Sequence, residues 1–259
     1  MRKAMGRDEG DREERALRRW RPGVRWYHPA MAYAVIRLSR FIMGRMNRLE
    51  IEEGERFDAL RERGGRGLLT FSNHVSMFDD PLLPCNMGLP KYSEVRWVAA
   101  DALNFYGSAW KAWIFTAGKA VPIVRGAGVD QPGLRFLLER LKEGEWVHIF
   151  PEGKRTRKPV GLMADELKAG IGMLMAEALP IALPFYHYGM HEVLPVGSLR
   201  PRRGKRVRLV FGEPIDCAAV AAGDGRGRIP SLMTKAALDA LQALERRVNP
   251  DAQKTLEAA

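Results

Sequence analysis

The sequence predicts a single α/β domain, with a central mixed β-sheet flanked by helices and an amphipathic segment in front of it. Two observations support this fold class. The 259 residues are enough for one sizeable hydrophobic core. From Gly67 onward, short apolar runs alternate with segments of helical periodicity. We therefore expect a basic arm and an interfacial helix over residues 1–49, and the folded domain over residues 50–259.

The N-terminal segment is strongly basic. Residues 1–49 hold thirteen Lys and Arg against five Asp and Glu, which is most of the formal charge of +11. Such an excess favours a polyanionic partner, either anionic lipid or nucleic acid. We interpret residues 1–19 as a solvated, partly disordered arm.

Residues 20–49 contain the first predicted helix, which begins at about Pro29 and follows Trp20, Trp26 and Tyr27. Aromatic side chains at one end and arginines along a polar edge are typical of a helix that lies in the plane of a membrane interface. A helix that packs on the domain with its arginines in water is an equal alternative. The arginines concerned are Arg37, Arg40, Arg45 and Arg48.

The elements of the domain follow from local periodicity. Apolar runs predict six strands, at residues 67–72, 95–99, 120–124, 145–150, 181–187 and 205–211. Leucines at spacings of three and four predict a helix over 132–143. A second helix is expected from Asp165 to Leu179, where Pro180 stops it, and a last one from a Ser231 cap.

The cysteine count and the distribution of apolar residues argue against several classes of protein. The two cysteines, Cys85 and Cys217, are too few for a disulfide framework and lack the spacing of a metal site, which suits a reducing compartment. No stretch reaches the roughly 20 apolar residues that span a bilayer. The N-terminus has the pattern of neither a secretory signal nor an organelle presequence.

Chemistry is indicated first at the end of the strand over 67–72, where His74 is followed five residues later by Asp79. One turn can bring the two side chains together. Histidine is suited to remove a proton from an attacking alcohol near neutral pH, and a carboxylate can hold its imidazole in one tautomer. This spacing alone is a weak signal, because a histidine beside a carboxylate is often structural.

A second strand end strengthens that interpretation. The strand over 145–150 runs into Pro151, Glu152 and Gly153, and a group of cations follows. A glycine turn lets backbone N–H groups approach an anion, and guanidinium groups can grip a phosphate. One strand end would supply the base, and the other the phosphate site, with Lys154, Arg155 and Arg157.

These two motifs resemble the signature of the glycerophospholipid (lysophosphatidate-type) acyltransferases, which is Asn-His, four residues, Asp, and later Phe-Pro-Glu-Gly. The matching blocks are NHVSMFDDP at 73–81, GKAVPIVRG at 118–126, EWVHIFPEGK at 145–154, KAGIGMLMAE at 168–177 and PIALPFYHYGMHEVLP at 180–195. The resemblance implies that His74 is the catalytic base and Asp79 its partner. It also implies that Arg125, Glu152 and Gly153 bind the glycerol-phosphate part of the substrate, with supporting roles for Asn73 and Asp80.

Within this family the chain is most similar to the tafazzin branch, which implies transfer of an acyl group from a phospholipid to a lysophospholipid, as in cardiolipin remodelling. The Arg-Thr-Arg after Lys154 is more similar to lysophosphatidate acyltransferases that use acyl-CoA or acyl-carrier protein, and this donor stays an alternative. We expect no metal and no cofactor, with acyl-CoA entering only as a donor substrate. The expected location is a peripheral one at an anionic membrane, at the cytoplasmic face of a bacterial inner membrane.

A non-catalytic lipid- or nucleic-acid-binding protein is the alternative of another class. The His74/Asp79 pair argues against it, and we expect no nucleic-acid partner because zinc-finger spacing and RNA-binding aromatic motifs are lacking. His148 is expected to be a core histidine, and His187 and His191 are assigned no metal. Trp97, Trp110, Trp113 and Phe115 fit either an acyl channel, an interfacial belt or core packing. Lys119 is expected at the surface or against a head group.

Overall fold

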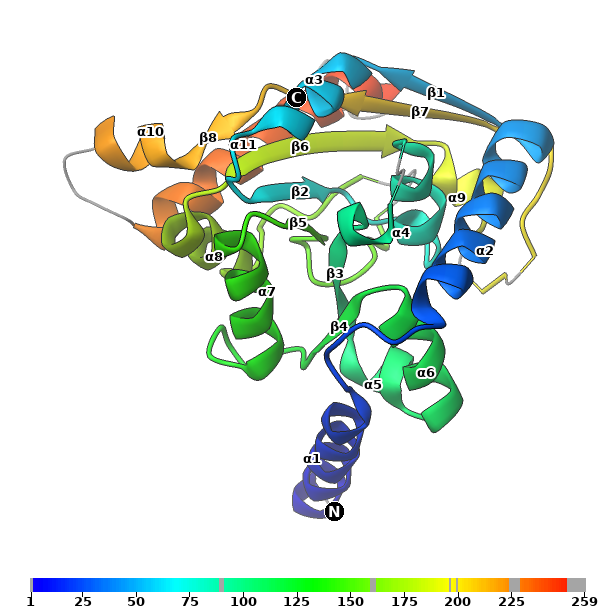
Figure 1. Ribbon diagram of the computed structural model, residues 1–259, viewed down its shortest axis with the longest axis vertical. Coiled ribbons are helices and arrows are strands. Elements are labelled where there is room, and N and C mark those ends of the chain that lie inside the picture. Colours follow the sequence, from blue (N-terminus) through cyan, green and yellow to red (C-terminus); the bar gives the residue numbers. More distant parts are fainter. Residues whose placement is uncertain are drawn as a thin grey trace.

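The computed structural model describes residues 2–88, 91–158, 162–195, 197–198, 200–223 and 229–250. Within these residues one mixed β-sheet forms the centre of the molecule, with strand order β1-β7-β6-β2-β5-β3-β4 and β8 paired with β6 (Figure 1). The strands are β1 Arg48–Glu52, β2 Leu68–Ser72, β3 Trp97–Asp101, β4 Ala120–Ile123, β5 Trp146–Ile149, β6 Ile181–Tyr188, β7 Arg206–Phe211 and β8 Ile215–Asp216. β7 and β8 run antiparallel to β6, and the other pairs are parallel. The predicted fold class is confirmed.

Helices cover both faces of this sheet. They are α1 Arg2–Arg19, α2 His28–Phe41, α3 Gly54–Ala59, α4 Asp79–Leu82, α5 Ala102–Tyr106, α6 Ala109–Ala117, α7 Pro132–Lys142, α8 Gly170–Ala178, α9 Met190–Val193, α10 Cys217–Gly223 and α11 Pro230–Val248. Because successive strand residues point to opposite faces, Leu69 packs with α7, α8 and α11, whereas Leu68 packs with α2, α3 and α4. A largely parallel sheet needs such cover on both sides.

All six predicted strands are present, and two further strands were missed. β1 lies at one edge of the sheet and carries charged residues that pair with β7: Arg206 with Glu50, and Arg208 with Glu52. Its apolar content is therefore too low for a strand signal. β8 has only two residues.

The predicted helices are present with shifted ends. α8 begins five residues later than expected, at Gly170. The expected Ser231 cap is wrong, because α11 begins at Pro230 with Ile229 as its N-cap residue. Proline is favoured at this first position, where its missing N–H has no partner to lose.

The N-terminal arm is ordered where it is described. α1 packs on α5 and α6 through Ala16, which is fully buried, and Arg19 donates from Nη1 to the carbonyl oxygens of Tyr106 and Gly107. A partly disordered arm was therefore the wrong expectation for these residues. Apolar packing and main-chain hydrogen bonds hold the helix against the domain, at the bottom of Figure 1.

α2 belongs to the core and also reaches the surface. His28, Ala32, Ile36 and Ser39 are buried, and a π-helical turn, Ile42–Met46, leads into β1. The expected boundary after residue 49 falls inside β1. The side of α2 away from the core exposes Tyr33, Val35, Leu38 and Phe41. Among the described helices, none is both long and apolar enough to cross a membrane.

Candidate active site

The loop after β2 brings His74 and Asp79 together. His74 Nδ1 lies 3.0 Å from Asp79 Oδ2, and the same oxygen accepts hydrogen bonds from the backbone N–H groups of Val75 and Ser76 at 2.7 and 2.8 Å. Asp79 is buried at the first turn of α4. Three donors on one oxygen fix the carboxylate and, with it, the imidazole.

The electrostatics of this pair favour an ionised aspartate. Burial opposes ionisation of Asp79, but nearby His187, His74 and the Ser76 N–H outweigh it and hold the pKa of Asp79 below its ordinary value. An ionised carboxylate accepts the Nδ1 proton of His74, which leaves Nε2 as the basic nitrogen. The imidazole stacks on Phe150, with ring centroids 4.1 Å apart, and its side chain is 16% exposed.

Glu152, which follows the neighbouring strand β5, supports the loop over residues 73–79, the candidate catalytic loop. Its buried carboxylate accepts from His74 N and Ala164 N, both at 2.8 Å. Burial raises the pKa of Glu152 to about 7. The residue was predicted to contact substrate, but both of its oxygens are directed at backbone N–H groups. The structure gives it a positioning contact beneath His74.

The glycine turn after Glu152 is ordered by its own hydrogen bonds. Gly153 has a φ of 71°, which favours glycine, and its N–H donates to Phe150 O at 3.0 Å. The N–H of Thr156 donates to His74 O at 2.7 Å, which ties this turn to the catalytic loop. The expected anion contact through Gly153 N–H is therefore not available in this arrangement.

The cations beyond this turn are placed differently from one another. Lys154 and Arg157 are exposed, whereas Arg155 is half-buried. Arg155 lines a pocket of about 210 Å³. Met77 of the catalytic loop also lines it, so the pocket adjoins the site. Its other lining residues are Leu194, Pro195, Gly197 and Ser198.

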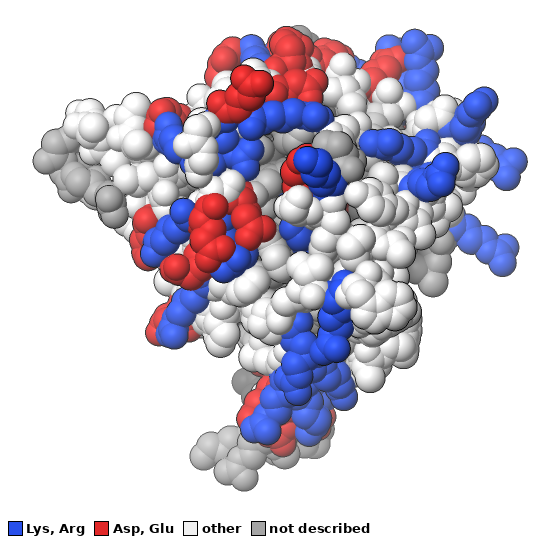
Figure 2. Space-filling view, viewed as in Figure 1, with Lys and Arg blue, Asp and Glu red and all other residues white. Residues whose placement is uncertain are grey.

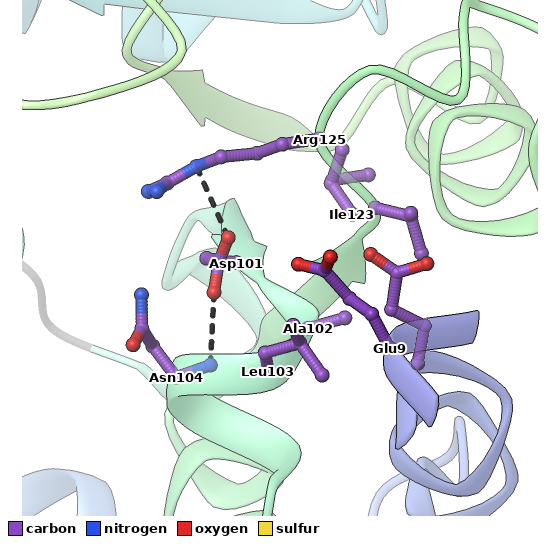
Figure 3. Close-up of a pocket in the computed structure, with 9 residues that line it drawn as sticks. Glu9, Asp101, Ala102, Leu103, Asn104, Ile123 and Arg125 are labelled. Atoms are coloured by element: carbon purple, nitrogen blue, oxygen red, sulfur yellow. Dashed lines mark hydrogen bonds and ion pairs between the residues drawn. The ribbon is translucent and has the colours of Figure 1, made fainter. Parts of the chain in front are cut away.

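Arg125 follows β4 and lies in a separate pocket. Its Nε is 3.0 Å from Asp101 Oδ2, and Asp101 also accepts from Asn104 N at 2.8 Å. Figure 3 shows Asp101 between these two partners, with Glu9 of α1 directed into the same pocket of about 250 Å³. β4 is two strand spacings, or about 10 Å, from β5, the strand that leads to Arg155. Arg125 and Arg155 line different pockets in this structure.

The two supporting residues hold the loop to its neighbours. Asn73 Nδ2 donates to His187 O at 2.9 Å, and its Oδ1 accepts from His187 N at 3.0 Å. Asp80 accepts from Arg96 Nε at 3.0 Å, and Arg96 is buried directly before β3. Asp80 thus joins α4 to β3 through an ion pair.

Other residues singled out in the sequence are structural. His148 is a buried core histidine, as predicted, with Nδ1 2.9 Å from Thr70 Oγ1. The expected surface position of Lys119 is wrong: its side chain is buried, and Nζ donates to Ser93 O and Val95 O. Nζ also lies 4.9 Å from the Trp97 ring centroid.

A histidine held by a buried aspartate at the carboxyl ends of the parallel strands is an arrangement that suits general-base catalysis in an α/β enzyme. The sequence profile of the family described as Acyltransferase matches residues 48–196, which include both strand ends of this site. The chain belongs to the Acyltransferase family. The resemblance inferred from the sequence is confirmed at this level.

Particular relatives agree with this assignment. The chain is 34% identical over 210 residues to a Drosophila melanogaster protein named tafazzin. The matched region covers 75% of this chain and 53% of that protein. It is 38% identical over 164 residues to an Arabidopsis thaliana N-acylphosphatidylethanolamine synthase, with 59% and 57% covered. The chain thus spans little more than half the length of these relatives.

A solved structure shares the fold. The crystal structure of the 1-acyl-sn-glycerophosphate acyltransferase PlsC from Thermotoga maritima superposes with a TM-score of 0.59 at 18% identity, covering 83% of this chain and 79% of that one. At this identity the likeness concerns the fold alone.

Proposed function

We propose that this protein transfers a fatty acyl group onto the free hydroxyl of a lysophospholipid, with His74 and Asp79 as the catalytic dyad. The observation that carries the proposal is the 3.0 Å contact between His74 Nδ1 and Asp79 Oδ2, which leaves His74 Nε2 as a base. A protein that only binds lipid has no use for such a base.

In the proposed mechanism, Nε2 of His74 removes the proton of the lysolipid hydroxyl as its oxygen attacks the acyl carbonyl carbon. Asp79 stabilises the imidazolium that forms. The intermediate then expels the donor's leaving group, which takes the proton back from Nε2. A well-placed general base typically contributes about 10²–10⁴ in rate. Neither a metal nor a cofactor has a part in these steps.

The proposed acyl donor is a phospholipid, as in tafazzin-like transacylation. The reaction then remodels phospholipids such as cardiolipin. The similarity to proteins named tafazzin supports this choice. The second candidate is acyl transfer to lysophosphatidate from acyl-CoA or acyl-carrier protein. Arg155 favours it, because this half-buried residue lies beside the loop of His74 and its guanidinium suits the phosphate monoester of lysophosphatidate.

A membrane-facing surface supports the lipid assignment. α2 and α6 lie side by side, joined by Tyr27 and Trp113, whose ring centroids are 5.6 Å apart. Trp26 is 91% exposed, and Trp110 and Trp113 are exposed by 63% and 51%. Figure 2 shows a largely uncharged area over α6, with Lys and Arg side chains along the upper right margin and along α1.

We propose that this surface, formed by Trp26, α2 and α6, rests on an anionic membrane. Tryptophans insert at the interface, and basic residues near the surface add about 1 kcal/mol each. The two interpretations of α2 are thereby combined, because its buried side packs on the domain while its other side is available to lipid.

The test supplies purified protein with vesicles that contain labelled diacyl phospholipid and an unlabelled lysophospholipid, without any thioester. We expect label in the acceptor, and His74→Ala should remove nearly all of it. His191→Ala is the matched control, because His191 lies on α9 and contacts Tyr188. Near-normal transfer by folded His74→Ala protein would refute the dyad. Transfer only after acyl-CoA or acyl-carrier protein is added would replace the first donor with the second.

A further inference from the structure

A second imidazole lies beside Asp79, and the mechanism above does not use it. His187 on β6 is buried, and its Nε2 lies 3.7 Å from Asp79 Oδ2. Asp79 therefore lies between two histidines, and only His74 reaches the surface.

His187 is bonded three times to Asn73, the residue before the catalytic base. Two of these bonds use the Asn73 side chain and the backbone of His187. The third joins His187 Nε2 to Asn73 O at 3.1 Å. A carbonyl oxygen can only accept, so this ring nitrogen carries the proton. The contact fixes the tautomer of His187.

The protonation state of His187 follows from its surroundings. Burial lowers the pKa of His187 despite the opposing effect of Asp79, so the ring is neutral at physiological pH. The titratable groups that face it are Asp79, His74, His148 and His191. Its Nδ1 is buried and finds no hydrogen-bond partner among the described residues. An unpaired buried nitrogen costs about 1–3 kcal/mol, so packing alone does not explain a histidine here.

We propose that His187 is a positioning residue for acyl transfer, whose Nε2–H holds Asn73 and places a positive dipole end beside the Asp79 carboxylate. Its first effect is geometric, because the bonds to Asn73 fix the backbone from which His74 extends. Its second effect is electrostatic. The N–H offsets part of the aspartate's charge and so limits how strongly the carboxylate stabilises imidazolium at His74. The reaction itself rests on the proposed function above.

Loss of the His187 N–H changes the electrostatic potential at His74. Without the N–H, the field of Asp79 at His74 becomes more negative, and imidazolium is favoured. His74 should then titrate at a higher pH, by about half a pH unit, and less of it would be free base near neutrality. Leucine at position 187 removes the donor, whereas glutamine retains an N–H at similar reach.

The experiment titrates His74 by NMR in full-length protein with isotope-labelled histidine, in the wild type, His187→Leu, His187→Gln and the control His191→Leu. We expect the His74 midpoint to rise by about half a pH unit in His187→Leu, and to stay at the wild-type value in His187→Gln and His191→Leu. Acyl transfer should fall at least about tenfold in kcat for His187→Leu, with little change in KM, and recover in His187→Gln.

Two outcomes would overturn the proposal: an unchanged midpoint with unchanged kcat in folded His187→Leu, or a shift of equal size in His191→Leu. If His187→Leu fails to fold, His187→Gln and His187→Asn replace it, since asparagine cannot carry a donor to the Nε2 position. A rise confined to His187→Asn then supports the proposal, and equal midpoints overturn it. The titration needs no substrate, so it stands even if the protein proves not to transfer acyl groups.

Discussion

Glu152→Gln separates what Glu152 contributes to stability from what it contributes to the catalytic loop. The carboxylate accepts two backbone N–H groups, from His74 and Ala164. Glutamine keeps the size of the side chain but offers one oxygen and one NH₂ group. Whichever way the amide turns, one N–H loses its acceptor and faces another donor. We therefore expect a strained contact either at His74 or at the segment that contains Ala164.

The size of the effect of pH on stability follows from the pKa of Glu152. A carboxyl whose pKa is raised from 4.5 to about 7 holds its proton more tightly in the folded protein. Its contribution to stability is fully present below the unfolded value and is lost as pH rises through the folded value, by about 3 kcal/mol. Glutamine does not titrate, so this loss is absent. At low pH the carboxyl is neutral, so the hydrogen bond that the amide cannot keep costs about 0.5–1.5 kcal/mol in return.

The two effects predict a pH-dependent pattern. In urea unfolding, Glu152→Gln should be slightly less stable than the wild type at about pH 4 and more stable than it, by about 2 kcal/mol, at about pH 8, because only the wild type loses stability as Glu152 ionises. Transfer should fall about 10- to 100-fold in kcat, since a small displacement of a base is costly. Glu245→Gln is the matched control: Glu245 accepts from Met163 N and Tyr186 Oη and does not touch His74.

The stability measurement tests whether Glu152 binds the proton, and the activity measurement tests whether it positions His74. If Glu152→Gln keeps the wild-type dependence of stability on pH, Glu152 is not the group that binds the proton. If it keeps the wild-type kcat, Glu152 does not position His74. A loss of kcat in Glu245→Gln as large as that in Glu152→Gln would mean that the surrounding segment matters and the contact with His74 does not.

Three further predictions use other contacts. Asp79→Asn should lower kcat by about 10²–10⁴ in folded protein, because the amide favours the wrong tautomer of His74; full activity would contradict the dyad. Gly172→Ala should destabilise the protein by at least about 1–3 kcal/mol in urea unfolding, since an added Cβ would lie 2.0 Å from Pro230 O where α8 meets α11; a wild-type midpoint would argue against that packing. Trp113→Ser should weaken sedimentation with anionic vesicles, whereas Ile51→Ser, an exposed apolar residue on β1, should not; equal binding by both would place the membrane contact elsewhere.

Elements of the fold were predicted correctly where their apolar residues follow one clear pattern. Buried strands such as β2 and β5 are continuous apolar runs, and α7 repeats leucine at helical spacing, so both kinds of element were predicted. β1 was missed because an edge strand is stabilised by cross-strand charge pairs, which leave no apolar run. α1 was expected to be disordered because its composition is charged, and nothing in that composition shows that Ala16 packs on α5.

The sequence predicted which residues form the site, but not the direction in which each side chain points. His74 and Asp79 are close in sequence, so one turn brings them together. Whether Glu152 points outward to substrate or inward to His74 N depends on how β2 and β5 pair. This pairing cannot be predicted from the motif alone. Lys119 is similar: its left-handed backbone, with φ of 57°, turns the side chain into the protein. His187 could have been noticed through its block, but its contact with Asp79 requires the pairing of β2 with β6.

The bonds that hold the catalytic loop also constrain the order in which the molecule can become active. His74 is bonded to a residue 78 positions later in the chain, and Asn73 to one 114 positions later. Closing such long loops is entropically unfavourable and slow compared with forming local helices. During synthesis His74 emerges early, yet its loop lacks the hydrogen bonds between Asn73 and His187 until β6 has emerged and paired with β2. Regain of activity on refolding should therefore lag behind the formation of helices and of the β2–β5 pair, and a chain that ends before β6 should hold its His74 loop only through the contacts with Asp79, Glu152 and Thr156.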